Sequence, residues 1–295
     1  MKFFQPWHDF LNEFLTQDTR AAVSFLLIVL ALSLALAGCA PPPAPPLRPQ
    51  PPLPGPDLLL KKLEENSRRT QRFAAQGRWS YEGPRGNQNA SFSLAAAFPD
   101  RIRLLAVDPF GRPALTVVAQ NGTVRLLSQR EARLYVGPTD RCLRKCFLPL
   151  GLDLSELMGL LSGGCPVWPY RQAEVSRDPS GLIRLALLGS TACPGAACQE
   201  EILMDAEKWL PRQVRLLAAD GRVLKEVVFA DYREAGGFEA PYEIAFSDLA
   251  EEVSLKVRYE EVRINLPLSD QLFTLEAPPG VFVQEVCRDE DDGCQ

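Results

Sequence analysis

The stretch RIRLLAVDPFGRPALTVVAQNGTVRLL, residues 101–127, holds three short apolar runs separated by two turn sequences. Asn121-Gly122 lies between the runs 114–120 and 123–128, and two residues that tolerate positive φ suit a tight type I′ turn. Asp108-Pro109-Phe110-Gly111 lies between the runs 101–107 and 114–120. Residues 101–127 therefore predict three consecutive antiparallel strands.

The same pattern of short apolar runs extends to both sides of this stretch. Asp220-Gly221 predicts a second hairpin of the same kind, between 213–219 and 222–229. Inside 252–264 the apolar residues change parity, which predicts a bulge near Glu260-Glu261. Together the runs predict about ten antiparallel strands in one domain. The further runs are 78–82, 90–97, 132–136, 182–188, 199–204 and 242–246, with another strand around Glu174.

Two segments have helical rather than strand spacing. The first is expected to begin at Asp57 as the cap and to end at Gly77. Its apolar stripe consists of Leu59, Leu60, Leu63 and Phe73. The second, LDLSELMGLLS at 152–162, has an unusually wide apolar face, which predicts a buried helix or one that covers a cavity.

The N-terminal segment has the features of an export signal. An apolar run at 21–37 meets Gly38-Cys39, and prolines follow at once. The run is also long enough for an uncleaved signal anchor, which is the alternative. The junction resembles the bacterial lipobox, which implies removal of residues 1–38 and lipidation of Cys39. Residues 39–56 are then a proline-rich, extended tether.

Charge and composition exclude several classes of function. Loss of residues 1–38 removes two basic and three acidic residues, which changes the net charge from −5 to −4 and leaves no basic surface for nucleic acid. His8, the single histidine, is removed with the signal, so histidine-dependent triads and histidine-bound metals are excluded. We expect neither a cofactor nor a metal.

Seven cysteines remain after Cys39, and export predicts disulfides. Cys193 with Cys198 and Cys287 with Cys294 would close short loops, and Cys142, Cys146 and Cys165 compete for one bridge. Spacing does not choose among the connectivities. A four-cysteine zinc site is the weaker alternative, because the spacings are unusual.

Neighbouring carboxylates occur at Glu200-Glu201, Glu251-Glu252 and Glu260-Glu261. Neighbours on a strand point to opposite faces, so acid–base pairs are not indicated and a solvated surface is expected. An acidic tail follows at 286–295.

Several strands have apolar residues on both parities, as in RIRLLAV at 101–107 and LIRLALL at 182–188. Such strands must be covered on both faces. Either the interior is a filled core, or a curved sheet surrounds an apolar cavity. The pattern by itself favours neither.

The chain resembles LolB and LolA, periplasmic proteins that carry acylated lipoproteins between membranes. The resemblance lies in the helix before Gly77, in residues 101–127 and in the helix at 152–163, while LFTLEAPPGVFV at 272–283 resembles the soluble carrier LolA more. The resemblance implies a mainly β fold, a half-open antiparallel β-barrel with helices as its lid, over 57–285. It implies an apolar cavity for acyl chains. Its candidate lining residues are Leu104, Val117, Leu157, Leu160, Leu161 and Leu185.

The same resemblance implies a membrane-contacting or client-releasing turn at Pro109, Phe110 and Gly111. The alternative is that Phe110 packs under its own turn. Ala40, after the lipidated cysteine, resembles an outer-membrane address. The proline tether, the extra cysteines and the acidic tail depart from the family pattern.

The expected function is therefore not enzymatic. The chain would be lipid-anchored at the periplasmic face of the outer membrane, receive acylated lipoproteins or phospholipid from a soluble LolA-like carrier, and insert them into the membrane. The alternative is an envelope scaffold or stress sensor that binds a protein partner with the same fold.

Overall fold

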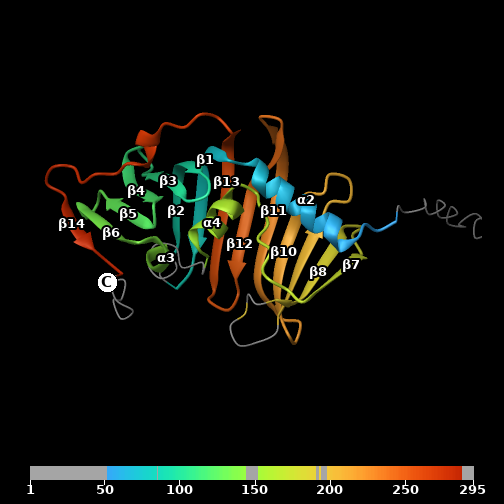
Figure 1. The fold of residues 1–295 in the computed structure, drawn as a ribbon. Coiled ribbons are helices and arrows are strands. Elements are labelled where there is room, and N and C mark those ends of the chain that lie inside the picture. The colour runs from blue at the N-terminus through green and yellow to red at the C-terminus, as the bar shows by residue number, and fades with distance from the viewer. Residues whose placement is uncertain (1–51, 85, 144–151, 191–192, 194–197, 288–295) are drawn as a thin grey trace, which may run out of the picture. The chain divides into compact units, whose positions relative to one another are not determined.

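The computed structural model describes residues 52–84, 86–143, 152–190, 193 and 198–287. Within this part of the chain, fourteen strands form one sheet, in the order β14-β6-β5-β4-β3-β2-β1-β13-β12-β11-β10-β9-β8-β7 (Figure 1). The strands are β1 Arg72–Glu82, β2 Gln88–Ala97, β3 Arg101–Val107, β4 Pro113–Gln120, β5 Thr123–Ser128, β6 Arg133–Pro138, β7 Gln172–Arg177, β8 Ile183–Ser190, β9 Cys198–Met204, β10 Pro211–Ala218, β11 Val223–Ala235, β12 Phe238–Asp248, β13 Val253–Ile264 and β14 Phe282–Glu285. The helices are α2 Pro56–Arg69, α3 Thr139–Cys142, α4 Leu154–Leu161 and the 3₁₀ turn η2 Asp270–Phe273.

Two antiparallel meanders, β1 to β6 and β7 to β13, join where β1 pairs with β13. The C-terminal segment then adds β14 parallel to β6. The outermost strands, β14 and β7, are not paired with each other, so the sheet is open. The fold is mainly β, as expected, but the expected barrel of about ten antiparallel strands is wrong. The parallel strand depends on the return of a distant segment, which no local pattern indicates.

The strand pattern of residues 101–127 is confirmed, and the two kinds of hairpin differ in geometry. Asn121 and Gly122 both have positive φ, 49° and 71°, as a type I′ turn requires. In the other hairpin Gly221 alone has positive φ, and its N–H donates to the carbonyl of Ala218. That turn is a type I turn followed by a bulge, so Asp220-Gly221 does form a hairpin but not the expected two-residue turn.

The bulge expected near Glu260-Glu261 is confirmed. Gln76 lies opposite Glu261 and Gly77 opposite Tyr259, which leaves Glu260 as the extra residue. Gly77 therefore lies within β1 and does not end a helix. A Cβ atom at this position would overlap the carbonyl oxygen of Arg258, so only glycine lets the two strands approach so closely.

The first helix is shorter than expected. α2 begins with Pro56 at its first position, after Gly55 as the cap residue, so Asp57 lies in the first turn and is not the cap. The helix ends at Arg69, and Phe73 is a buried residue of β1. The apolar alternation of β1 begins at Phe73, and it overrides the helical spacing that the preceding leucines suggest.

The second predicted helix is confirmed as α4. Asp153 accepts a hydrogen bond from the N–H of Glu156, and the Glu156 carboxylate accepts one from the N–H of Asp153. This capping box fixes the start of the helix. Figure 1 shows α2 and α4 lying against the same face of the sheet.

The two faces of the sheet are buried by different elements. The face under α2 and α4 holds the main core, including Leu59 and Met158. On the opposite face, Phe273 of η2 packs on Ala97 and Val118. This cover explains why strands in that region carry apolar residues on both parities.

The disulfide pairing is partly local and partly long-range. Cys193 bonds to Cys198, as their spacing suggested. Cys142 bonds to Cys287, across a sequence separation of 145 residues, so the expected Cys287–Cys294 loop is wrong. The return of the C-terminal segment beside β6 brings Cys287 to the end of α3. Cys165 is a buried free thiol.

Contacts divide the chain into residues 1–52 and residues 53–295. The predicted signal, Cys39 and most of the tether lie outside the described residues. In the described part, no helix combines the length and the apolar composition needed to cross a membrane.

Candidate functional site: an apolar cavity under α4

A cavity of about 230 Å³ lies between α4 and the inner face of the sheet. Its wall consists of apolar and aromatic side chains, with Gln88 as the exception. They come from six neighbouring strands, β5-β4-β3-β2-β1-β13, and from the helical side. The lining residues are Trp79, Tyr81, Gln88, Phe92, Leu94, Ile102, Leu104, Leu115, Val117, Ala119, Leu126, Leu143, Leu154, Leu157, Leu161, Leu255 and Val257.

The wall of the cavity has a sheet side and a helical side. Six neighbouring strands form the sheet side, and Leu154, Leu157 and Leu161 of α4 lie on the helical side.

Of the six residues that the sequence analysis proposed for the cavity wall, four line it and two do not. Leu104, Val117, Leu157 and Leu161 lie on its wall. Leu160 does not: it is on the other side of α4 and lines a polar groove and a narrow apolar gap.

Leu185 does not line the cavity either, because it is fully buried in the core on β8. Conversely, sequence reasoning missed Trp79 and Tyr81, which share the inner face of β1 with Phe73. Their strand was predicted at 78–82, but the spacing along a strand does not indicate that one of its faces lines a cavity.

Both ends of α4 are fastened to the rest of the domain. At the N-terminal end, the indole Nε1–H of Trp168 donates to Glu156 over 2.9 Å, and the backbone N–H of Trp168 donates to Glu200 over 3.2 Å. At the C-terminal end, the hydroxyl of Tyr259 donates to the carbonyl of Leu161. These bonds hold the helix over the cavity.

The carboxylates at 200 and 201 are buried, so the expectation of a solvated surface is wrong for this pair. Glu201 forms an ion pair with Arg184 on the neighbouring strand. Glu200 has no cationic partner in the described part of the chain, and burial raises its pKa from 4.5 to about 8. Both faces of β9 are covered, so side chains at odd and even positions are buried alike. The alternation of residues along a strand does not reveal such double cover. Glu251, Glu252 and Glu260 are exposed and Glu261 half-buried.

Phe110 is the most exposed large apolar residue described, at 83%. It does not pack under its own turn. Asp108 accepts hydrogen bonds from the N–H groups of Phe110 and Arg112 and pairs with the Arg112 guanidinium, and these contacts hold the pKa of Asp108 below its usual range. The Arg112 guanidinium lies beside the exposed ring, at 5.3 Å from its centroid.

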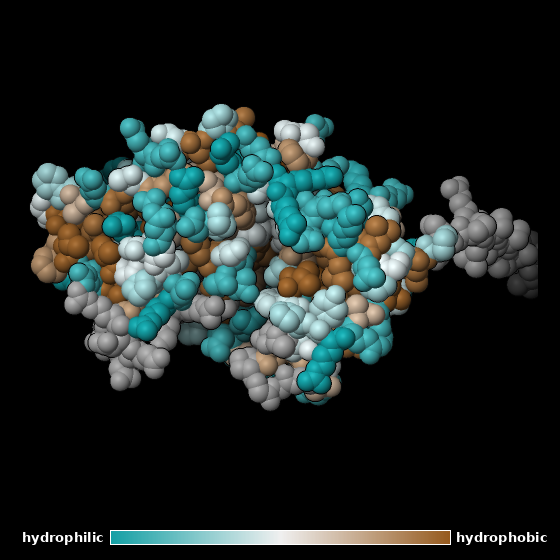
Figure 2. Space-filling model, viewed as in Figure 1, coloured by the Kyte–Doolittle hydropathy of each residue, from teal (hydrophilic) through white to brown (hydrophobic). Residues whose placement is uncertain are grey.

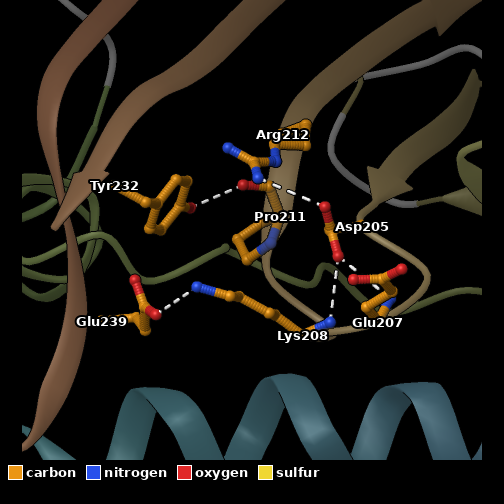
Figure 3. A network of polar contacts seen from close by, with 7 residues as sticks. All are labelled: Asp205, Glu207, Lys208, Pro211, Arg212, Tyr232 and Glu239. Carbon is orange, nitrogen blue, oxygen red and sulfur yellow. Dashed lines mark hydrogen bonds and ion pairs between the residues drawn. The ribbon is translucent and has the colours of Figure 1, made fainter. Parts of the chain in front are cut away.

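A separate polar network lies near α2, and both of its cations have a carboxylate partner (Figure 3). Lys208 pairs with Glu239, and Arg212 pairs with Asp205 while its guanidinium covers the ring of Tyr232. Tyr232 donates its hydroxyl to the carbonyl of Pro211. Since the two cations are neutralised within the network, we interpret it as a structural fastening of the turn at 205–210.

No cluster of three or more potential metal ligands occurs among the described residues. The described residues that line the cavity include no nucleophile paired with a base.

Three comparisons relate the chain to known proteins. A family model described only as uncharacterized protein-like matches residues 199–277. The search of curated proteins finds no match.

Among solved structures, a DUF1329 family protein from Desulfovibrio piger has a TM-score of 0.53 and 12% identity, over 74% of this chain and 95% of that one. A domain from Vibrio parahaemolyticus, named for outer membrane lipoprotein sorting, has a TM-score of 0.50 and 14% identity, over 74% and 97%. A LolA superfamily protein from Nitrosomonas europaea has a TM-score of 0.49 and 12% identity, over 76% and 99%. At such identities the first two likenesses show the fold alone, and that fold is the LolA-like one that the sequence motifs indicated.

Proposed function

We propose that this protein, which has a LolA-like fold, is an envelope lipoprotein. It would bind acyl chains under α4 and release them into a membrane. The observation that supports the proposal is the apolar cavity closed by the helix. Burial of an acyl chain stabilises a complex by roughly 0.8 kcal/mol per CH₂ group, which is ample for binding.

The size of the cavity sets a limit on what the closed form holds. Its volume of about 230 Å³ is below the ~300–1,000 Å³ range of drug-sized ligand sites. A cavity of this volume suits one acyl chain or part of one. A client with two or three acyl chains requires α4 to move outward, so the bonds of Trp168 and Tyr259 are the contacts that must open.

Release needs contact with a membrane, and Phe110 is suited to make it. Its ring is exposed on a turn that is closed by hydrogen bonds to Asp108. With lipidation at Cys39 and the proline tether, the domain would act near the outer membrane's periplasmic face, and a soluble LolA-like carrier would supply its clients.

The test is native mass spectrometry of the full chain carrying Cys39→Ser, expressed with export to the periplasm, followed by lipid extraction. Co-purified acylated peptide or phospholipid is expected. Leu157→Asn should reduce it, because Leu157 lines the cavity. Leu160→Asn is the matched control, since Leu160 is equally buried on the same helix but faces away from the cavity.

A chain without bound lipid that also fails to take up an acylated peptide added in excess would contradict the proposal. An equal loss of lipid in the two leucine variants, with α4 still folded by hydrogen exchange, would contradict binding at the Leu157 side of the helix.

A second candidate function is the binding of a protein partner at β14, as an envelope scaffold would do. Figure 2 shows apolar residues gathered over β14, β6 and β5. Phe282 and Val283 of β14 are 66% and 49% exposed. The outer edge of β14 has no strand beside it among the described residues, which suits an added strand. Loss of a co-purifying protein in Phe282→Ser, with lipid retained, would favour this function.

A further inference from the structure

The segment that joins α4 to β7, residues 162–171, is held to the domain by few polar contacts, and we call it the strap. Among the described residues, no backbone–backbone hydrogen bond involves its central part, 165–170, in which two prolines have no N–H to donate. Trp168 supplies the contacts instead. Its backbone N–H donates to Glu200 on β9, and its indole Nε1–H donates to Glu156 on α4.

Of these two acceptors, Glu200 has the less favourable surroundings for a charge. Its carboxyl group is fully buried; one oxygen accepts the Trp168 N–H, and the other has no hydrogen-bond partner among the described residues. The residues beside it in register are apolar, Leu187 on β8 and Leu216 on β10. An ionised carboxylate with one hydrogen bond is strongly disfavoured in such a place. The closed strap therefore holds Glu200 in its neutral form.

The sulfur groups near Glu200 offer it no positive charge. On the strap, Cys165 is a buried free thiol, and burial together with Glu200 raises its pKa, which keeps the thiol neutral. On β9, Cys198 lies two residues before Glu200 and is bonded to Cys193, so it does not titrate.

The charged groups on the elements around Glu200 are engaged elsewhere. Lys225 on β11 lies two strands away in the same cross-strand row, and its Nζ is 3.0 Å from Asp248. Glu156 on α4 accepts two hydrogen bonds from N–H groups. Burial is thus the main influence on Glu200: it raises the pKa from 4.5 to about 8, although the N–H of Trp168 acts in the opposite direction.

Opening of the strap would admit water to Glu200 and return its pKa toward 4.5. Between 4.5 and about 8 the closed form then holds a proton that the open form releases. The ratio of open to closed molecules therefore rises with pH in this range, by up to about tenfold per pH unit. Below 4.5 both forms hold the proton and above about 8 both have lost it, so the ratio is constant there.

Movement of the strap reaches α4 by two routes. The strap continues directly from the C-terminal end of the helix. In addition, the indole of Trp168 is bonded to Glu156, whose carboxylate also accepts the N–H of Asp153 at the start of the helix. A strap that leaves the sheet thus loosens both ends of α4, and with it the helical side of the cavity wall.

We propose that Glu200 is a proton-operated latch: its neutral carboxyl group holds the strap and α4 closed over the cavity, and its ionisation as the pH rises releases both. This inference rests on the proposed function and adds the condition under which a bound acyl chain leaves. The free energy of local opening, rather than that of unfolding the whole domain, is what the latch changes.

Hydrogen exchange followed by mass spectrometry tests the latch in the full chain carrying Cys39→Ser, from pH 5 to pH 8. Each rate is divided by that of the same peptide in the Glu200→Gln variant, because the chemical exchange rate at one pH is the same in both. The ratio for 154–171 should rise by up to about tenfold per pH unit, while that for β12 stays constant. Glu200→Leu, which also cannot ionise, should serve equally well as the reference.

Glu201→Gln is the matched control. Glu201 is the neighbouring carboxylate, but it points to the opposite face of β9 and pairs with Arg184. This variant should keep the pH dependence of exchange in 154–171. A loss of the dependence in Glu201→Gln as well would contradict the assignment of the latch to Glu200.

Ligand release gives a second readout. The probe is a fluorescent hexadecanoyl peptide without groups that titrate between pH 5 and pH 8, and its dissociation is followed after addition of excess vesicles of phosphatidylethanolamine and phosphatidylglycerol. Dissociation from the unaltered chain and from Glu201→Gln should become faster as the pH rises. Dissociation from Glu200→Gln should not change with pH.

The failures of the two proposals are distinguishable. A probe that binds at no pH would overturn the proposed function, and exchange alone would then decide on the latch. An exchange ratio in 154–171 that is constant with pH would overturn the latch. So would an equal rise in β12, because ionisation would then unfold the whole domain. Faster exchange without faster dissociation would contradict the role of the latch in release.

Discussion

The hydroxyl of Tyr259 on β13 donates a hydrogen bond of 2.7 Å to the carbonyl oxygen of Leu161, the last residue of α4. The same ring contacts Phe73 and Phe92 edge-on, at centroid distances of 5.7 and 6.0 Å. One side chain thus connects the cover of the cavity to the strands beneath it. Opening of the cavity and loss of this bond are therefore expected to occur together.

Tyr259→Phe should lower the free energy of unfolding by about 1 kcal/mol and loosen α4, because the Leu161 carbonyl loses its partner. Hydrogen exchange followed by mass spectrometry should show faster exchange in residues 154–162 than in β12. An unchanged exchange rate in the helix would mean that this bond does not hold it closed.

The buried Glu200 predicts a stability that falls as the pH rises. Its pKa is raised from 4.5 to about 8 in the folded protein, so between these values the folded chain holds a proton that the unfolded chain has released. Below about 4.5 the contribution is fully present; above about 8 it is lost. The slope is at most ~1.4 kcal/mol per pH unit.

Glu200→Gln should flatten this slope in urea titrations at pH 5, 6, 7 and 8. Glu201→Gln is the neighbouring control, since it breaks the ion pair with Arg184 and should lower stability without removing the slope. If the Glu200→Gln variant and the unaltered chain showed parallel pH dependence, the pKa of Glu200 would not be raised as stated.

Two glycines predict opposite effects of adding a methyl group. Gly77→Ala should destabilise the domain by more than ~2 kcal/mol, because its Cβ would meet the backbone of Arg258 at the bulge. Gly159→Ala, in α4 with open space around it, should stabilise by about 0.5–1 kcal/mol. Thermal unfolding measures both, and similar effects at the two sites would refute the strand contact at Gly77.

The Cys142–Cys287 bond fastens the C-terminal segment beside β6. Replacing both cysteines by serine should lower the free energy of unfolding by about 2–5 kcal/mol, because the bond closes a long loop. The bond between Cys193 and Cys198 spans a sequence separation of only 5, so its replacement by two serines should cost less. Guanidinium titration of the two double variants gives the comparison; a larger loss for the short loop would contradict it.

Phe110→Ser should leave stability within about 0.5 kcal/mol, because the ring is exposed. It should nevertheless slow transfer of a diacylated lipopeptide to vesicles of phosphatidylethanolamine and phosphatidylglycerol, measured by flotation. Phe282→Ser removes a second exposed aromatic ring elsewhere on the domain and should not slow transfer. Equal transfer rates for the Phe110→Ser variant and the unaltered chain would exclude the membrane role of Phe110.

Much of the local structure was predictable from the residues alone. Asn121-Gly122, the short apolar runs at 101–107 and 123–128, and the parity change near Glu260 indicated the strands, the turn and the bulge, because backbone sterics and side-chain period act within a few residues. The apolar face of 152–162 likewise determined a covering helix.

Other features were decided by contacts between distant segments. The pairing of β14 with β6 set the Cys142–Cys287 bond, and packing on both faces of β9 buried Glu200. The packing of α4 against the sheet placed Trp79 and Tyr81 on a cavity wall and left Leu160 on the other side of the helix. Sequence period says which residues share a face, but which other segment covers that face depends on the free energy of packing the whole chain.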